Sequence, residues 1–152
     1  MLNFKKFYYA QQIFSAESKE AIRYAVKMGN QSQTVIHLIH TLEAPIVMDS
    51  NSAMYYQKMI DTLNASAEND MNNLLAELRE KYSGYQFTGV VKDNADSAES
   101  IVEFAKSIEA EAIIMSSHGR RGIKRLLMGS VTESVMRLSD IPVVIIRHQN
   151  KK

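Results

Sequence analysis

Residues 112–117 read AIIMSS, and this stretch decides the fold that the sequence predicts. Its first four side chains are apolar with no alternation between polar and apolar positions. That pattern is typical of a strand buried on both faces of a parallel sheet. Parallel neighbours need crossover connections, which are usually helices. The stretch therefore predicts an α/β sheet that is covered by helices on both sides.

The segments on either side of this strand alternate between strand-like and helix-like patterns. Strand-like runs occupy residues 7–10, 34–39, 85–91 and 143–146, and helical patterns occupy 15–28, 53–82, 97–108 and a segment that begins near 129–130. Alternation of this kind implies parallel strands joined by right-handed crossovers. We expect a Rossmann-like α/β fold with three layers, a doubly wound five-stranded parallel sheet, and a single domain over residues 1–152.

The composition excludes several classes of protein. The 152 residues are 45% hydrophobic, which argues against wholesale disorder, and the net charge of +1 argues against a polyanion binder that works by bulk charge. The absence of cysteine excludes disulfides, a thiol nucleophile and a cysteine-ligated metal. No apolar run reaches membrane-spanning length, and residues 1–14 are too polar for a signal peptide. We expect a soluble, cytoplasmic protein.

The long helical pattern over residues 53–82 has one apolar face, which we expect to cover the sheet. Its members are Met59, Ile60, Leu63, Ala67, Met71, Leu74, Leu75 and Leu78. The last strand, Val143 to Ile146, is expected at a sheet edge, where its backbone groups would remain unpaired. Pairing with the same strand of a second copy predicts a homodimer.

The loop after the buried strand carries residue types that suit a phosphate. Gly119 and Gly129 are places where the backbone can approach an anion closely, and Gly129-Ser130 opens a helix with free N–H groups. Four basic residues lie between Arg120 and Arg125 with no acid among them. The same residues also fit a plain turn, a helix cap and a solvated basic face, and these two interpretations stay open.

Other polar residues have simple structural interpretations. His118 either contacts a phosphate or is an exposed loop residue. His37 and His40 are three apart in a strand, so they point to opposite faces and cannot form a compact metal site. Ser97 is expected to cap the helix after the third strand. Asp93 and Asp96 either hold magnesium beside a nucleotide or serve that helix terminus, and the second interpretation is favoured.

Residues 115–131 resemble the C-terminal signature of the universal stress protein family, which is Gly, two residues, Gly, nine residues, then Gly followed by Ser or Thr. Gly119, the nine residues 120–128 and Gly129-Ser130 fit the later part of this signature. The apolar strand before it and residues 142–144, Pro-Val-Val, after it fit as well. The resemblance extends over essentially the whole chain.

The resemblance implies an adenine nucleotide alpha hydrolase-like fold, a homodimer, and a role in the stress response as a binding module rather than an efficient enzyme. It implies an adenine nucleotide, ATP, AMP or ADP, with magnesium as a further candidate ligand. Carried over by position, the nucleotide-binding residues would be Leu38, Met115, Ser116, Gly119, Arg120, Gly129, Ser130 and Val131.

The chain departs from the family pattern at three positions. Ser116 replaces the first glycine of the signature, Ile13 stands where ATP-binding members carry an aspartate, and Ala95 replaces a glycine that commonly follows the third strand. These departures favour the alternative of a homodimeric protein-interaction scaffold that binds no nucleotide. The sequence contains no Walker-type loop, so any hydrolysis should be very slow. Nucleic-acid binding through the basic cluster is not the favoured function.

Overall fold

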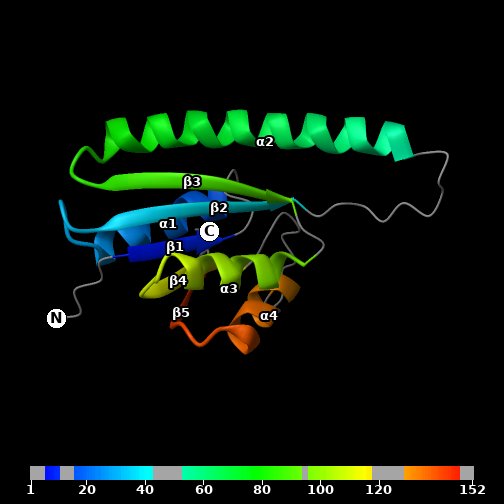
Figure 1. The fold of residues 1–152 in the computed structure, drawn as a ribbon. Helices are drawn as coiled ribbons and strands as arrows, with labels where there is room; N and C mark the ends of the chain where they lie inside the picture. The colour runs from blue at the N-terminus through cyan, green and yellow to red at the C-terminus, as the bar shows by residue number, and fades with distance from the viewer. Residues whose placement is uncertain (1–5, 11–15, 43–52, 94–95, 118–128, 148–152) are drawn as a thin grey trace, which may run out of the picture.

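The computed structural model describes residues 6–10, 16–42, 53–93, 96–117 and 129–147. Parallel strands alternate with helices along these segments, as the sequence predicts, and the strands form one sheet in the order β3-β2-β1-β4-β5 (Figure 1). The elements are β1 (Lys6–Ala10), α1 (Ala16–Met28), β2 (Val35–Leu42), α2 (Ala53–Lys81), β3 (Gln86–Asp93), α3 (Ser97–Ser107), β4 (Ala112–Ser116), α4 (Ser130–Leu138) and β5 (Val143–Ile146). The predicted position of β5 at an edge of the sheet is confirmed.

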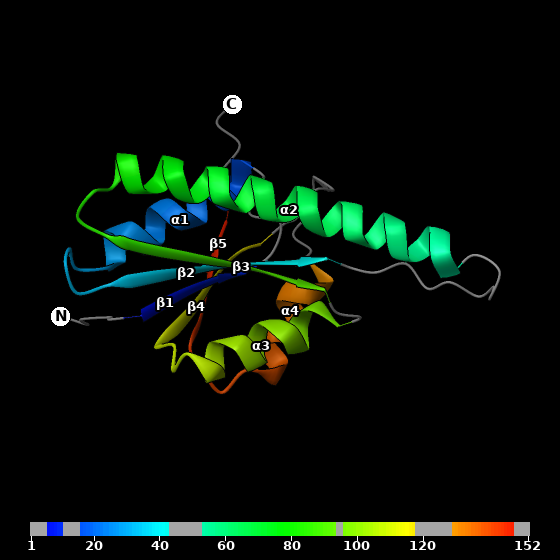
Figure 2. The ribbon, with the colours of Figure 1, turned by 45° about the horizontal axis from the view of Figure 1, so that its top comes forward.

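Helices cover both faces of the sheet. Figure 2 shows α1 and α2 on one side and α3 and α4 on the other. Successive side chains of a strand point to opposite faces. Accordingly, Ala112 and Ile114 of β4 join the cluster beneath α1 and α2, whereas Ile113 and Met115 join the cluster beneath α3 and α4. All of these side chains are fully buried, which explains why β4 has no polar alternation.

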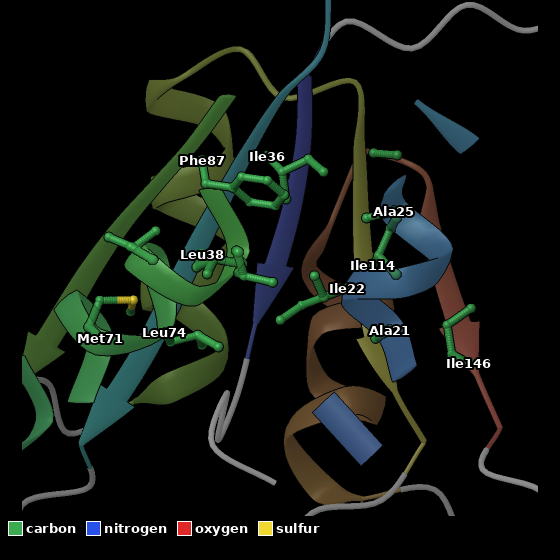
Figure 3. Packing of buried hydrophobic residues seen from close by; sticks show 13 residues of the cluster. Ala21, Ile22, Ala25, Ile36, Leu38, Met71, Leu74, Phe87, Ile114 and Ile146 are labelled. Carbon is green, nitrogen blue, oxygen red and sulfur yellow. The ribbon is translucent and has the colours of Figure 1, made fainter. Parts of the chain in front are cut away.

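The cluster beneath α1 and α2 joins elements that are far apart in the sequence. Figure 3 shows Ile22 of α1 close to the sheet that carries Leu38 and Ile114, while Met71 and Leu74 of α2 lie on the part of the sheet nearer β3. A fully buried aliphatic side chain of this kind stabilises the fold by about 1.5–3 kcal/mol. These contacts hold the central strands in place and thereby position their carboxyl ends.

The amino-terminal part of α2 differs from the sequence-based expectation. Six members of the predicted apolar face are buried, namely Ile60, Ala67, Met71, Leu74, Leu75 and Leu78, but Met59 and Leu63 are 42% and 44% exposed. The Asn64 amide lies 3.5 Å from the carboxylate of Asp93, the last residue of β3, so the first turns of α2 extend beyond the sheet (Figure 1). The helical periodicity of α2 predicts its apolar face but contains no information on where the sheet beneath it ends. Neither α2 nor any other described helix is long and apolar enough to cross a membrane.

Close packing of α2 on β3 depends on Gly89. A β-carbon at this position would overlap the Met71 sulfur and lie 2.8 Å from Met71 Cγ and 3.1 Å from Leu75 Cδ1. The two distances to Met71 are shorter than β-carbons adopt in proteins, and the distance to Leu75 is tighter than most. Met71 and Leu75 therefore fill the space that a side chain at position 89 would occupy.

Asp96 caps α3, and the prediction that Ser97 is the cap is wrong. The Asp96 carboxylate accepts hydrogen bonds from the backbone N–H groups of Ala98 at 2.9 Å and Glu99 at 3.1 Å. Aspartate and serine are both good caps, so the sequence did not distinguish two adjacent candidates. The favoured interpretation of Asp96, as a residue that serves the helix terminus, is confirmed.

Candidate functional site

The carboxyl ends of β1, β2 and β4 form the region where a ligand is expected. The chain builds the sheet outward from β1 to β3 and then returns to β4 on the other side of β1, so the strand order reverses between β1 and β4. Open parallel sheets bind ligands outside the strands at such a point. Ala10, the last residue of β1, is level with Ile39 of β2 and Met115 of β4. The residues that follow Ile39 and Met115 therefore flank the end of β1.

Three hydrogen bonds fix α4 and β5 to the end of β4. The Gly129 N–H donates to the Ser117 carbonyl at 3.1 Å, and the Thr132 hydroxyl donates to the Ser116 carbonyl at 3.3 Å. The Ser117 N–H in turn donates to the Ile146 carbonyl at 2.9 Å. Ser116, Ser117 and Thr132 are all buried. The start of α4 is thus held rigidly beside the region described above.

The amino terminus of α4 lacks a side-chain cap. Its N-cap residue is Gly129, which has no side chain to bond the N–H groups of the first turn. The first N–H groups of a helix have no partner within the helix, and the helix dipole adds positive potential there. Ser130 is exposed and Val131 is half-buried, and both lie in this first turn. The terminus is therefore suited to an anion, although the Gly129 amide itself is already bonded to Ser117.

No described protein atom requires a glycine at position 129. A β-carbon there would lie 3.8 Å from the Ser117 oxygen and 3.9 Å from the Thr132 hydroxyl, both ordinary contacts. The backbone angles, φ −62° and ψ 145°, are open to every residue. Glycine thus leaves bare backbone beside the helix terminus, as a closely approaching ligand would require.

The structure brings some of the expected site residues together and does not describe others. Gly129, Ser130 and Val131 lie together at the start of α4, next to Ser116 at the end of β4. Gly119 and Arg120 lie outside the described residues, as do Ile13, Ala95 and His118.

Leu38 and Met115 are core residues of the sheet, so their expected place beside a nucleotide stays a prediction. Both side chains are 0% exposed, and each belongs to a hydrophobic cluster, Leu38 beneath α1 and α2 and Met115 beneath α3 and α4. Leu38 also pairs with Tyr9, before the end of β1. Each side chain packs between the sheet and the helices that cover its face. Only the backbone of Met115 lies level with the end of β1.

His40 and Thr41 are residues of this region that the sequence analysis missed. They follow Ile39 in β2, beyond the end of β1, and are 9% and 7% exposed. Polar side chains at the carboxyl end of an otherwise apolar strand are a usable signal, since buried polar groups need partners. The place of His40 at the end of β2 matters here, rather than its spacing from His37.

The described carboxylates do not gather into a metal site. No group of three or more His, Asp or Glu side chains in the described segments is placed to hold a metal ion. Asp96 is committed to the start of α3, and Asp93 accepts from the Asn64 amide at 3.5 Å. Within these segments, the region offers N–H and hydroxyl donors to an anion rather than a carboxylate pair for acid–base chemistry.

Comparison with known proteins identifies relatives of the whole chain. The model of the universal stress protein family matches residues 4–147. Universal stress protein MJ0577 of Methanocaldococcus jannaschii is 31% identical over 96 residues, which are 63% of this chain and 57% of that protein. Universal stress protein YxiE of Bacillus subtilis is 27% identical over 135 residues, which are 86% of this chain and 90% of that protein.

Solved structures have the same fold. The MJ0577 structure superposes with a TM-score of 0.82 at 25% identity, covering 99% of this chain and all of that one. A universal stress protein family protein of Arabidopsis thaliana, solved with AMP bound, superposes with a TM-score of 0.63 at 17% identity, covering 96% of this chain and 93% of that one. Since the family model matches nearly the whole sequence and the fold agrees with that of solved members, the chain belongs to the universal stress protein family.

Proposed function

We propose that this protein is a stress-response binding module that holds an adenine nucleotide at the carboxyl edge of its sheet. The observation that carries the proposal is the start of α4, where Gly129 provides neither a side-chain cap nor a packed contact. Helix termini of this kind bind phosphates through backbone N–H groups. The phosphates would lie against the first turn of α4, which Ser117 and Thr132 hold in place.

The rest of the nucleotide would lie along the ends of β1 and β2. His40 and Thr41 are polar groups there, beyond the last residue of β1. A base or ribose needs a few correctly placed polar partners. Among the described residues, His40 and Thr41 are candidates for the role of the aspartate that ATP-binding members carry at the position of Ile13. The AMP bound to the Arabidopsis relative supports this ligand class for the fold.

Turnover is expected to be slow. Phosphoryl transfer needs a metal ion and a positioned nucleophile, and the described part of the chain shows no carboxylate cluster beside α4. We expect hydrolysis well below about 1 per second, the lower end of the ordinary enzyme range.

A homodimer scaffold is the second candidate function, and the edge strand β5 favours it. Val143, Val144 and Ile145 are only partly buried, and the nearby α4 side chains Met136 and Leu138 are 47% and 43% exposed. An apolar edge strand that is left open invites pairing with another strand. Sedimentation equilibrium at micromolar concentration should give a dimer, and a stable monomer would exclude this scaffold.

Calorimetric titration with ATP and with AMP, each with and without magnesium, tests the nucleotide proposal. We expect binding to the wild-type chain and at least about tenfold weaker binding to Gly129→Ala, because the added methyl group occupies the space meant for the ligand. Gly84→Ala is the matched control, since Gly84 lies against the Gln31 side chain, away from α4. Absence of binding to the wild type, or equal affinity of Gly129→Ala, would refute the proposal.

A further inference from the structure

The hydroxyl of Ser97 is a buried polar group that the fold itself does not use. Ser97 is the first residue of α3 and is 5% exposed. Its hydroxyl has no hydrogen-bond partner among the described residues. It does not cap the helix either, because the Asp96 carboxylate already accepts from the N–H groups of Ala98 and Glu99. Buried polar groups in native proteins are almost always hydrogen-bonded, so an unpartnered one calls for a functional explanation.

The packing of α3 on β2 shows which part of the sheet Ser97 faces. Ser97, Ile101 and Phe104 have the spacing i, i+4, i+7, which places them on one face of the helix. The Phe104 ring meets the His37 ring of β2 edge to face, with the centroids 6.4 Å apart. Ile101 belongs to the same hydrophobic cluster as Ile39 of β2. Each step toward the amino terminus of α3 thus corresponds to a step toward the carboxyl end of β2.

The next step along this face brings Ser97 to the level of Thr41. Side chains alternate along a strand, so Thr41 points to the same face of the sheet as His37 and Ile39. From Phe104 back to Ser97 the helix rises two turns, roughly 10 Å, and from His37 to Thr41 the strand covers roughly 13 Å. Accordingly, α3 begins beside the arrowheads of β2 and β3 (Figure 1). Ser97 therefore faces the carboxyl edge of the sheet.

The start of α4 lies on the same face and at the same edge. Figure 2 shows α3 and α4 on one side of the sheet, and Val131, in the first turn of α4, packs against the cluster that contains Ile101 of α3. Only β1 separates β2 from β4. Two strand spacings are roughly 10 Å. A ligand whose phosphates lie at α4 and that crosses the end of β1 would bring its far end to Thr41 and Ser97.

We propose that the Ser97 hydroxyl binds the base of the nucleotide whose phosphates lie at the start of α4. This inference rests on the function proposed above and assigns one of its contacts. The ribose is attached directly to the phosphates, whereas the base is the end remote from them, so the base is the part that reaches Ser97. A serine hydroxyl can both donate and accept, which suits the amino group and the ring nitrogens of adenine. The new hydrogen bond offsets the cost of burying this hydroxyl.

Calorimetric titration of the full chain with AMP tests the proposal. Ser97→Ala should bind AMP about five- to tenfold more weakly than the wild type does, because one hydrogen bond to the base is lost. Ser107→Ala is the matched control. Ser107 is exposed and is the last residue of α3, at the opposite end of the helix, so AMP affinity should not change. Equal AMP affinity of Ser97→Ala and the wild type would overturn the proposal.

Ribose 5-phosphate, which lacks the base, separates a contact to the base from a general effect on the site. NMR titration that follows the amides of Ser130 and Val131 should give the same affinity for the wild type and for Ser97→Ala. Weaker binding of ribose 5-phosphate by this variant would overturn the assignment to the base. If the wild type binds neither AMP nor ribose 5-phosphate, the nucleotide proposal itself fails. If it binds both and Ser97→Ala binds them equally well, only the role of Ser97 is refuted.

Thermal unfolding without ligand distinguishes a ligand contact from a structural role. Replacing an unpartnered buried hydroxyl with a hydrogen atom removes no hydrogen bond, so the Tm of Ser97→Ala should equal or exceed that of the wild type. Weaker AMP binding together with an undiminished Tm is the expected result. A lower Tm would show that the hydroxyl serves the fold, and this result would also overturn the proposal.

Discussion

Gly89 in β3 and Gly129 before α4 both lie beside a helix, yet their surroundings are opposite. At Gly89 the protein itself fills the space of the absent side chain, with Met71 and Leu75 pressed against the strand. At Gly129 the nearest atoms to a β-carbon would be 3.8 Å away, so the space is not used by the described protein. The first glycine serves packing, and the second leaves room for something else. Glycine in a sequence does not reveal which of these roles it has.

The largest expected effect comes from removing a side chain in the packed region. Leu75→Ala should lower the free energy of unfolding by about 2–5 kcal/mol, because Leu75 is 6% exposed and its loss leaves a cavity. Urea denaturation measures this change. Leu138→Ala is the matched control, since Leu138 is 43% exposed and should cost much less. Equal losses for the two variants would show that the α2–β3 contact is not packed as described.

Gly89→Ala should have a smaller but clear effect of about 1–3 kcal/mol, since the added methyl group overlaps Met71. The same denaturation experiment, extended to the double variant with Met71→Ala, sharpens the comparison. Shortening Met71 makes room for the methyl group, so the double variant should lose less stability than the sum of the two single variants. Strict additivity would contradict direct contact between these residues.

Gly129→Ala should change stability least, within about 0.5 kcal/mol. Alanine is a poorer N-cap than glycine, but it also restricts the unfolded chain, and the two effects oppose each other. A thermal or urea melt without nucleotide measures the change. Unaltered stability together with weakened nucleotide binding would assign Gly129 to a ligand. A loss comparable to that of Gly89→Ala would instead show that Gly129 serves the fold.

Much of the architecture could be predicted from short stretches of sequence. The apolar run of β4 correctly indicated burial on both faces, since Ile113 and Ile114 pack beneath different helix pairs. The length of α2 was predicted to within one residue of its observed end at Lys81. The exposure of Met59 and Leu63 was not predicted, although Ile60, which lies between them in α2, is buried as expected.

The candidate site was predictable in part. Gly129 and Ser130 stand where the spacing of the signature placed them, at the start of a helix. Leu38 and Met115 were expected beside a ligand, but the structure places both in the core. The sequence shows where a residue stands along a strand. It does not show which face of the sheet the side chain points to, or which helices cover that face.

Local patterns in the sequence were enough to specify alternating strands and helices, the start of a helix at Gly129-Ser130 and the edge position of β5, but not that no side chain caps this helix. Secondary-structure propensity and periodicity depend on residues that are close together in the sequence, so local patterns are sufficient to predict them. The roles of the two glycines and the extension of α2 beyond the sheet were decided only by the tertiary structure. They depend on which distant segments meet, and contacts such as that between Met71 and Gly89 arise only when the helix lies on the sheet.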